Sequence, residues 1–199
     1  IKSYGGNETY YPLKETALPS TIEGIVMDLD GTFVNSELFW IEVIKETFIK
    51  TTGMKNFTFT KEDIPYISGH TTLEHLEYCL RKYDTLNKIN VALENYYIIA
   101  KEKLKKITTQ NDISLVPTKG LDTIITLCKK NKVKLGLVTS GCYDKAYPEI
   151  VSVIKQLGYK KIEEVFDTVV TTGNPISKQV MGTLGEIVAK PHPWLYNEA

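Results

Sequence analysis

Apolar positions along this chain follow two patterns, one typical of buried strands and one typical of helices. Short apolar runs bounded by glycine or polar residues predict strands at 24–28, 133–139 and 166–171. Apolar residues at helical spacing, with start and stop signals at their ends, predict helices. These helices cover 36–49, 71–80, 90–107, 118–131 and 143–157. Strand and helix alternate in the second half, which predicts an α/β fold with a parallel sheet and helices on both faces.

The order of these elements predicts three regions. Residues 1–21 are polar and rich in turn residues, and we expect them to form an N-terminal arm. The α/β core is expected to combine 22–35 with 112–199. Residues 36–111 interrupt it after the first strand, and their helical pattern predicts a separate helical lobe.

Composition narrows the class of protein. The chain has 199 residues, 42% hydrophobic and 24% charged, as in ordinary globular proteins. Lys plus Arg and Asp plus Glu each total 24, so we expect neither a nucleic-acid nor a membrane-surface partner. Three scattered cysteines are too few for a disulfide framework or a zinc site. Without an apolar run of membrane-spanning length or a signal peptide, a cytoplasmic location is expected.

The candidate chemistry lies at the end of the first predicted strand, in Asp28-Leu29-Asp30-Gly31-Thr32. Ligands of open α/β sheets bind beyond the carboxyl ends of the strands. Two carboxylates two residues apart leave such a strand on the same side, and they repel each other unless a cation lies between them. We therefore expect Asp28 and Asp30 to bind a divalent metal, and Mg²⁺ suits oxygen ligands. A simple turn is the alternative, whereas a calcium-binding EF-hand would need ligands that are missing.

Three motifs in order resemble the haloacid dehalogenase superfamily, in its branch of phosphatases and phosphomutases with a helical cap. The first extends the aspartate motif over 28–37, the second is the strand and loop at 135–141, and the third is Lys190 ahead of a proline and a helix. Pro117-x-x-Gly120 is similar to the return from cap to core. The resemblance covers 22–199 and implies a Rossmann-like core with an inserted cap.

The resemblance also implies catalytic roles. Asp28 would be the nucleophile that forms an aspartyl-phosphate, and Asp30 would be the general acid and base. Lys190 would offset negative charge between the nucleophile and the phosphate. Mg²⁺ would bridge Asp28, the carbonyl group of Asp30 and the phosphate.

Substrate binding is implied for a second group of residues. Thr139 and the backbone N–H groups that follow, at Ser140 and Gly141, would hold the phosphoryl oxygens. His70 lies in a predicted cap loop, a region that faces the active site in capped members of the family. It is equally well explained as a surface histidine beside a helix start.

The function implied is a magnesium-dependent phosphatase that hydrolyses a small phosphorylated metabolite, such as phosphoglycolate or a sugar phosphate. A β-phosphoglucomutase-like phosphomutase is an alternative, but those relatives carry a histidine where this chain has Trp40. A non-catalytic fragment that binds a phosphorylated ligand is another. The aromatic residues at 39 and 40 have helical spacing and are expected in the core.

One family feature is missing from the chain: the fourth motif, an acidic pair after a further strand, which would supply a metal ligand. We therefore expect a core that is incomplete at its C-terminal end, and little or no activity from the chain as given. The strand at 25–29 is then expected to be an edge strand.

Overall fold

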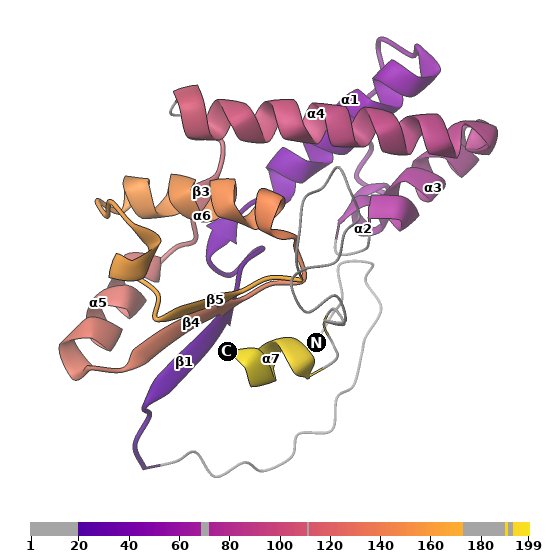
Figure 1. Cartoon of the computed structure of the whole chain (residues 1–199). Helices are drawn as coiled ribbons and strands as arrows, with labels where there is room; N and C mark the ends of the chain where they lie inside the picture. The colour runs from indigo at the N-terminus through magenta and orange to yellow at the C-terminus, as the bar shows by residue number, and fades with distance from the viewer. Residues whose placement is uncertain (1–19, 69–71, 111, 173–189, 191–192) are drawn as a thin grey trace. The chain divides into compact units, whose positions relative to one another are not determined.

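A computed structural model describes most of the chain. The described residues are 20–68, 72–110, 112–172, 190 and 193–199 (Figure 1). Nearly all of the predicted N-terminal arm lies outside them.

The chain divides into two compact units. One comprises Glu23–Val43 with Tyr96–Ala199 and is termed the core unit; the other comprises Ile1–Ile22 with Ile44–Asn95 and is termed the helical unit. The cap boundaries given above, 36–111, stay a prediction.

The core unit is built on a parallel sheet of three strands in the order β1-β4-β5 (Figure 1). β1 spans Gly24–Asp28, β4 spans Lys134–Val138 and β5 spans Thr168–Val170. The last residue of each strand is in register with the last residue of its neighbour. The carboxyl ends therefore meet at one edge, and the predicted parallel α/β fold is confirmed.

Burial differs between the strands. In β4 every residue after Lys134 is buried, as expected of a central parallel strand. In β1, Ile25 and Val26 are 36% and 45% exposed. Among the described residues β1 pairs only with β4, so it is an edge strand there, as predicted.

Helices cover this sheet on two sides. α5 spans Leu121–Asn131, α6 spans Tyr143–Gln156 and α7 spans Trp194–Glu198, with a short 3-10 helix η2 at Ile162–Glu164. α6 lies on one side of the sheet and α7 on the other (Figure 1). The buried apolar residues of α6 recur at helical spacing. They are Ala146, Ile150, Val153 and Ile154.

Two short strands lie beside the carboxyl edge of the sheet. β2 (Val34–Asn35) pairs antiparallel with β3 (Val116–Pro117). The first follows β1 and the second precedes α5, so two segments about 80 residues apart are joined here. This pairing fixes the turn that follows β1.

The helical unit contains α2 (Ile64–Ile67), α3 (Thr72–Lys82) and η1 (Leu86–Lys88). α1 (Glu37–Thr52) and α4 (Ile89–Gln110) each contribute to both units. The helical unit also contains a cluster of aromatic rings in mutual contact. They belong to Phe48, Phe57, Phe59 and Tyr83. Within the described ranges, no helix has the length and apolar character needed to span a membrane.

Asp63 is a buried carboxylate in the helical unit, 1% exposed. It accepts hydrogen bonds from Lys82 Nζ at 2.5 Å, Tyr78 Oη at 2.7 Å and the Thr60 N–H at 2.8 Å. Burial raises the pKa of Asp63, but the donors, Lys82 first, outweigh this effect and lower the pKa to about 2. The ionised side chain therefore ties α2 to α3.

We expect Asp63→Asn to lower the free energy of unfolding by about 2 kcal/mol at neutral pH. The folded-state pKa lies below the ordinary value of 3.8, so this stability is present above about pH 4 and is lost as pH falls toward 2. Urea titrations from pH 2 to 7 measure it. Glu77→Gln, which removes an exposed ion pair with Arg81, is the control, and its effect should be small. A difference between wild type and Asp63→Asn that does not change with pH would contradict this assignment.

Candidate active site at the carboxyl edge of the sheet

Two aspartates leave the end of β1 on the same side. Asp28 ends the strand, Leu29 is fully buried, and the side chains of Asp28 and Asp30 are 40% and 43% exposed. The Leu29 carbonyl accepts three backbone N–H groups of the following turn, at 2.9 to 3.3 Å. Gly31 has a φ of +73°, a left-handed conformation that costs little only for glycine. The turn therefore brings both carboxylates to the edge where ligands bind in α/β sheets.

Lys190, the residue of the third motif, contacts Asp28, the first residue of the first motif. Its ammonium group donates to Asp28 Oδ1 and, at 3.3 Å, to the Val138 carbonyl at the end of β4. Its backbone N–H donates to Ser140 Oγ at 3.0 Å. All three motifs named in the sequence thus meet at one place.

The loop after β4 is fixed to the end of β5. The Thr139 N–H donates to the Val170 carbonyl at 3.0 Å, and Thr172 Oγ1 donates to the Ser140 carbonyl at 2.8 Å. Thr139 is 1% exposed, and its Oγ1 accepts the Gly141 N–H at 2.9 Å. The Gly141 N–H is therefore already used within the loop, whereas the Thr139 hydroxyl keeps its own hydrogen to donate.

Asp30 is held by two donors. Lys145 Nζ donates to both of its oxygens, at 2.9 and 2.7 Å, and Ser36 Oγ donates to Oδ1 at 2.6 Å. Burial raises the pKa of Asp30, but the charge and hydrogen bonds of Lys145, together with Ser36, outweigh it, so the pKa is lowered. Asp30 is therefore ionised at neutral pH.

Lys145 in turn contacts two side chains that the sequence motifs did not identify, Glu149 and Trp40. Its Nζ lies 3.4 Å from the fully buried Glu149 and 4.9 Å from the centroid of the Trp40 ring. Trp40 Nε1 donates to Glu149 Oε1 at 2.7 Å. Burial raises the pKa of Glu149 while Lys145 opposes that rise. Trp40 was expected in the core with Phe39; Phe39 is buried, but Trp40 is half-buried and bonds to this carboxylate.

The Lys145–Glu149 pair has a weak sequence signal, because Lys and Glu four residues apart on a helix usually lie on the surface. His70 lies outside the described residues. The structure therefore brings together Asp28, Asp30, Ser140 and Lys190 and says nothing of His70.

Magnesium is the metal that the family resemblance implies, and the Asp28 carboxylate suits it. In the described part of the chain, Lys190 is the one side chain that donates to Asp28, and it does so at Oδ1, which leaves Oδ2 for a cation. Mg²⁺ sites in enzymes often use one or two carboxylates with waters and substrate phosphate. Among those same residues, no group of three or more His, Cys, Asp or Glu is placed to hold a metal.

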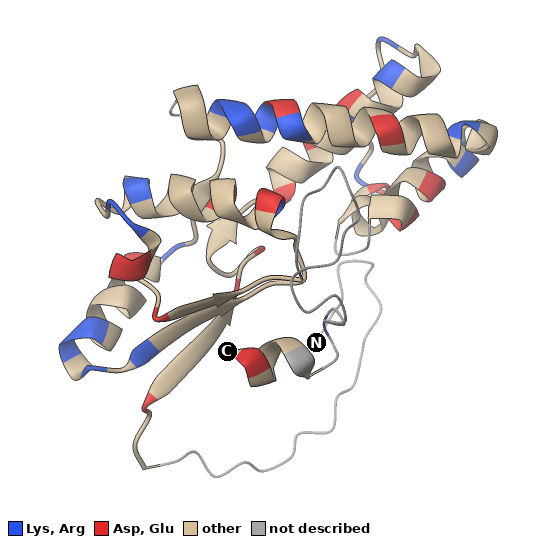
Figure 2. Cartoon of the chain, in the orientation of Figure 1, with Lys and Arg blue, Asp and Glu red and all other residues tan. Residues whose placement is uncertain are grey.

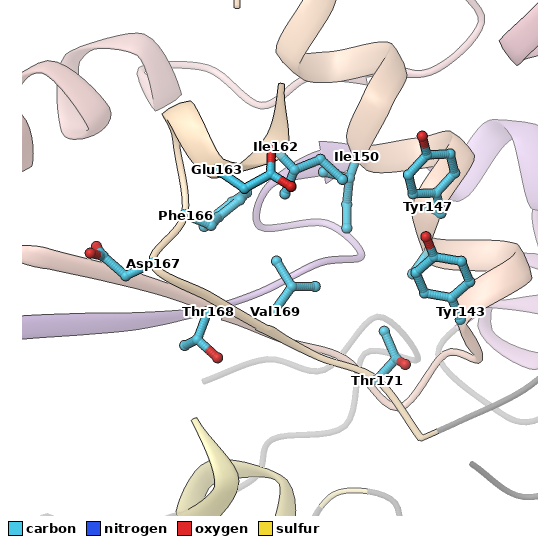
Figure 3. Close-up of a pocket in the computed structure, with 11 residues that line it drawn as sticks. Tyr143, Tyr147, Ile150, Ile162, Glu163, Phe166, Asp167, Thr168, Val169 and Thr171 are labelled. Atoms are coloured by element: carbon cyan, nitrogen blue, oxygen red, sulfur yellow. The ribbon is translucent and has the colours of Figure 1, made fainter. Parts of the chain in front are cut away.

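A cavity of about 300 Å³ lies beside β5, between α6 and η2 (Figure 3). Tyr143, Tyr147 and Phe166 line it together with the acidic residues Glu163 and Asp167. No basic residue is among its described lining. Glu163 is acidic and Asp167 is paired with Lys134, so the described lining offers no positive charge to a phosphate, and this cavity is not a second candidate site for it.

Comparison with known proteins identifies the family. Residues 25–199 match the family model described as haloacid dehalogenase-like hydrolase. The chain belongs to this family. No curated protein matches its sequence.

Solved structures share the fold of this haloacid dehalogenase-like chain at low sequence identity. One is a predicted phosphoglycolate phosphatase from Haemophilus somnus, with TM-score 0.62, 15% identity, and coverage of 90% of this chain and 71% of that one. CbbY from Rhodobacter sphaeroides in complex with phosphate gives TM-score 0.56, 17% identity, and coverage of 90% and 71%. β-Phosphoglucomutase from Clostridium difficile gives TM-score 0.54 and 18% identity, with coverage of 89% of this chain and 69% of that one.

We expect Gly31→Ala to lower the free energy of unfolding by about 1–2 kcal/mol, because alanine is strained at this positive φ. Gly24→Ala is the matched control, since an added Cβ meets Lys134 atoms at 3.7 Å, an ordinary contact. Urea denaturation of both variants measures the difference. Equal stability of the two variants would show that the turn does not depend on glycine.

Proposed function

We propose that this hydrolase is a magnesium-dependent phosphatase that acts on a small phosphomonoester through an aspartyl-phosphate intermediate. The observation that carries the proposal is the contact of Lys190 with Asp28 at the carboxyl edge of the sheet, with Asp30 on the same side of the strand. Lys190 neutralises part of the nucleophile's charge and so favours approach of an anionic phosphate.

The reaction has two steps. An Asp28 oxygen attacks phosphorus, the ester P–O bond breaks, and the departing oxygen takes a proton from Asp30. Asp30 then accepts a proton from water, whose oxygen attacks phosphorus and releases inorganic phosphate, which regenerates the Asp28 carboxylate.

Electrostatics favour one of the two roles of Asp30. Because Lys145 and Ser36 stabilise its ionised form, Asp30 is ready to act as the base. Only a small fraction carries a proton at neutral pH, so substrates whose leaving oxygen needs protonation should react more slowly.

Phosphate binding is proposed for the loop after β4. The Thr139 hydroxyl and the Ser140 N–H are suited to donate to phosphoryl oxygens, whereas Gly141 could do so only if its N–H left Thr139 Oγ1. When bound, Mg²⁺ would be held by the Asp28 carboxylate and the Asp30 carbonyl and would stabilise negative charge on the phosphoryl group. The attraction is local, because acidic and basic residues are interspersed over the helices (Figure 2).

The substrate class is proposed as phosphoglycolate or a sugar phosphate, which fits the names of the structural neighbours. A phosphatase is favoured over a phosphomutase because Trp40 stands at the position of the mutase histidine. Its indole N–H donates to Glu149 and has no basic nitrogen with which to move a proton. A cytoplasmic location is part of the proposal, since all three cysteines are free.

In the full-length protein, we expect Asp28→Asn to abolish Mg²⁺-dependent hydrolysis of 4-nitrophenyl phosphate, because the amide cannot act as the nucleophile. Asp122→Asn, an exposed position on α5, is the matched control and should retain full activity. Removal of divalent metal with EDTA should also stop turnover, and added Mg²⁺ should restore it. Equal activity of wild type and Asp28→Asn would exclude this residue as the nucleophile.

A further inference from the structure

A chain of three side chains in contact ends at the Asp30 carboxylate. They are Lys145, Glu149 and Trp40, and none of them attacks phosphorus or transfers a proton in the two reaction steps above. Lys145 Nζ donates to both Asp30 oxygens, at 2.9 and 2.7 Å. The same ammonium contacts Glu149, which accepts Trp40 Nε1 at 2.7 Å. The contacts run from α1 through α6 to the turn after β1.

We propose that Lys145 is a positioning residue that fixes the orientation of the Asp30 carboxylate for proton transfer, with Glu149 and Trp40 holding Lys145 in place. The inference rests on the proposed function, in which Asp30 moves the proton. It adds residues outside the three motifs to the working site.

The two hydrogen bonds from Lys145 account for this role. A carboxylate bound at one oxygen can rotate about its terminal bond, but a donor shared by both oxygens restricts that rotation. A lysine side chain has a flexible stem of four carbons, and its ammonium group normally lies in water. Here its Nζ lies over the Trp40 ring, and the side chain is 20% exposed. The contacts on both sides therefore hold a flexible group in one place.

Glu149 is the unusual member of this set. Its side chain is 0% exposed, and a fully buried carboxylate is costly unless it is paired and hydrogen-bonded. Both conditions are met, by Lys145 and by the Trp40 N–H. Glu149 in turn restricts where the Lys145 ammonium group can lie.

The stem of Lys145 also lies close to the loop after β4, for which phosphate binding is proposed above. A Cβ added at Gly141 would lie 3.3 Å from Lys145 Cδ and 3.3 Å from Thr139 Oγ1. The backbone of this loop and the lysine stem therefore lie in close contact. Lys145 thus lies beside both Asp30 and this loop.

The test compares variants of the full-length protein by kcat and KM for 4-nitrophenyl phosphate with Mg²⁺. Lys145→Met alone would leave Glu149 buried without its cation and can prevent folding. The double variant Lys145→Met/Glu149→Gln removes both charges and keeps an oxygen for the Trp40 N–H. We expect kcat to fall about tenfold or more, with KM changed less than about twofold, because a charge-assisted hydrogen bond at the reacting group is lost. Lys145→Arg, which can donate to both oxygens, should keep most of kcat.

Lys134→Met is the matched control, since it removes an exposed ion pair with Asp167 at the far end of β4. Its kcat and KM should equal those of wild type. Thermal unfolding of each variant confirms that it is folded. A wild-type kcat in the double variant would overturn the positioning role, and so would a loss of kcat in Lys145→Arg as large as in the double variant.

A second measurement does not depend on activity. The indole N–H resonance of Trp40 in ¹⁵N-labelled protein, assigned with Trp40→Phe, should shift in the double variant and stay unchanged in Lys134→Met. An unshifted resonance in the double variant would contradict the chain of contacts. Failure of the proposed function gives a different result. The full-length wild-type protein would then show no Mg²⁺-dependent hydrolysis, and the positioning role would be excluded as well. If only the positioning role is wrong, the full-length wild-type protein stays active.

Discussion

The site depends on the pairing of Lys190 with Asp28, a contact between residues 162 positions apart. It requires β1 and β4 to lie parallel with their last residues in register, because the lysine also donates to the Val138 carbonyl at the end of β4. A shift of one residue between these strands would turn Asp28 to the other face of the sheet. The geometry of this candidate site is therefore tied to the register of two short strands.

Acidic and basic side chains alternate at the carboxyl edge of the sheet. Asp28, Asp30 and Glu149 supply the carboxylates, and Lys145 and Lys190 lie against them. The chain as a whole has no net charge, so its overall field does not attract an anion. In the proposed function, attraction for a phosphoryl group arises here, where lysines and backbone N–H groups are fixed before the substrate binds.

The sequence was sufficient to predict the parallel α/β core and the meeting of Asp28 with Lys190, because both follow from local patterns at strand ends. The position of Lys145 beside Asp30 was not predictable in this way. Lys and Glu four residues apart on a helix usually form a surface pair, and the burial of Glu149 results from packing against Trp40, 109 residues away. Trp40 was expected in the core because its spacing is helical, and spacing does not show that an indole N–H has a buried acceptor.

The central claim is that Asp28 carries the phosphoryl group. Reduction of an acyl phosphate with borohydride converts the aspartate that bore it to homoserine, which peptide mass spectrometry locates. In protein quenched during turnover of a phosphomonoester with Mg²⁺, the account predicts homoserine at position 28 and unmodified aspartate at position 30. Turnover with unmodified Asp28, or with the modification at another residue, would contradict it.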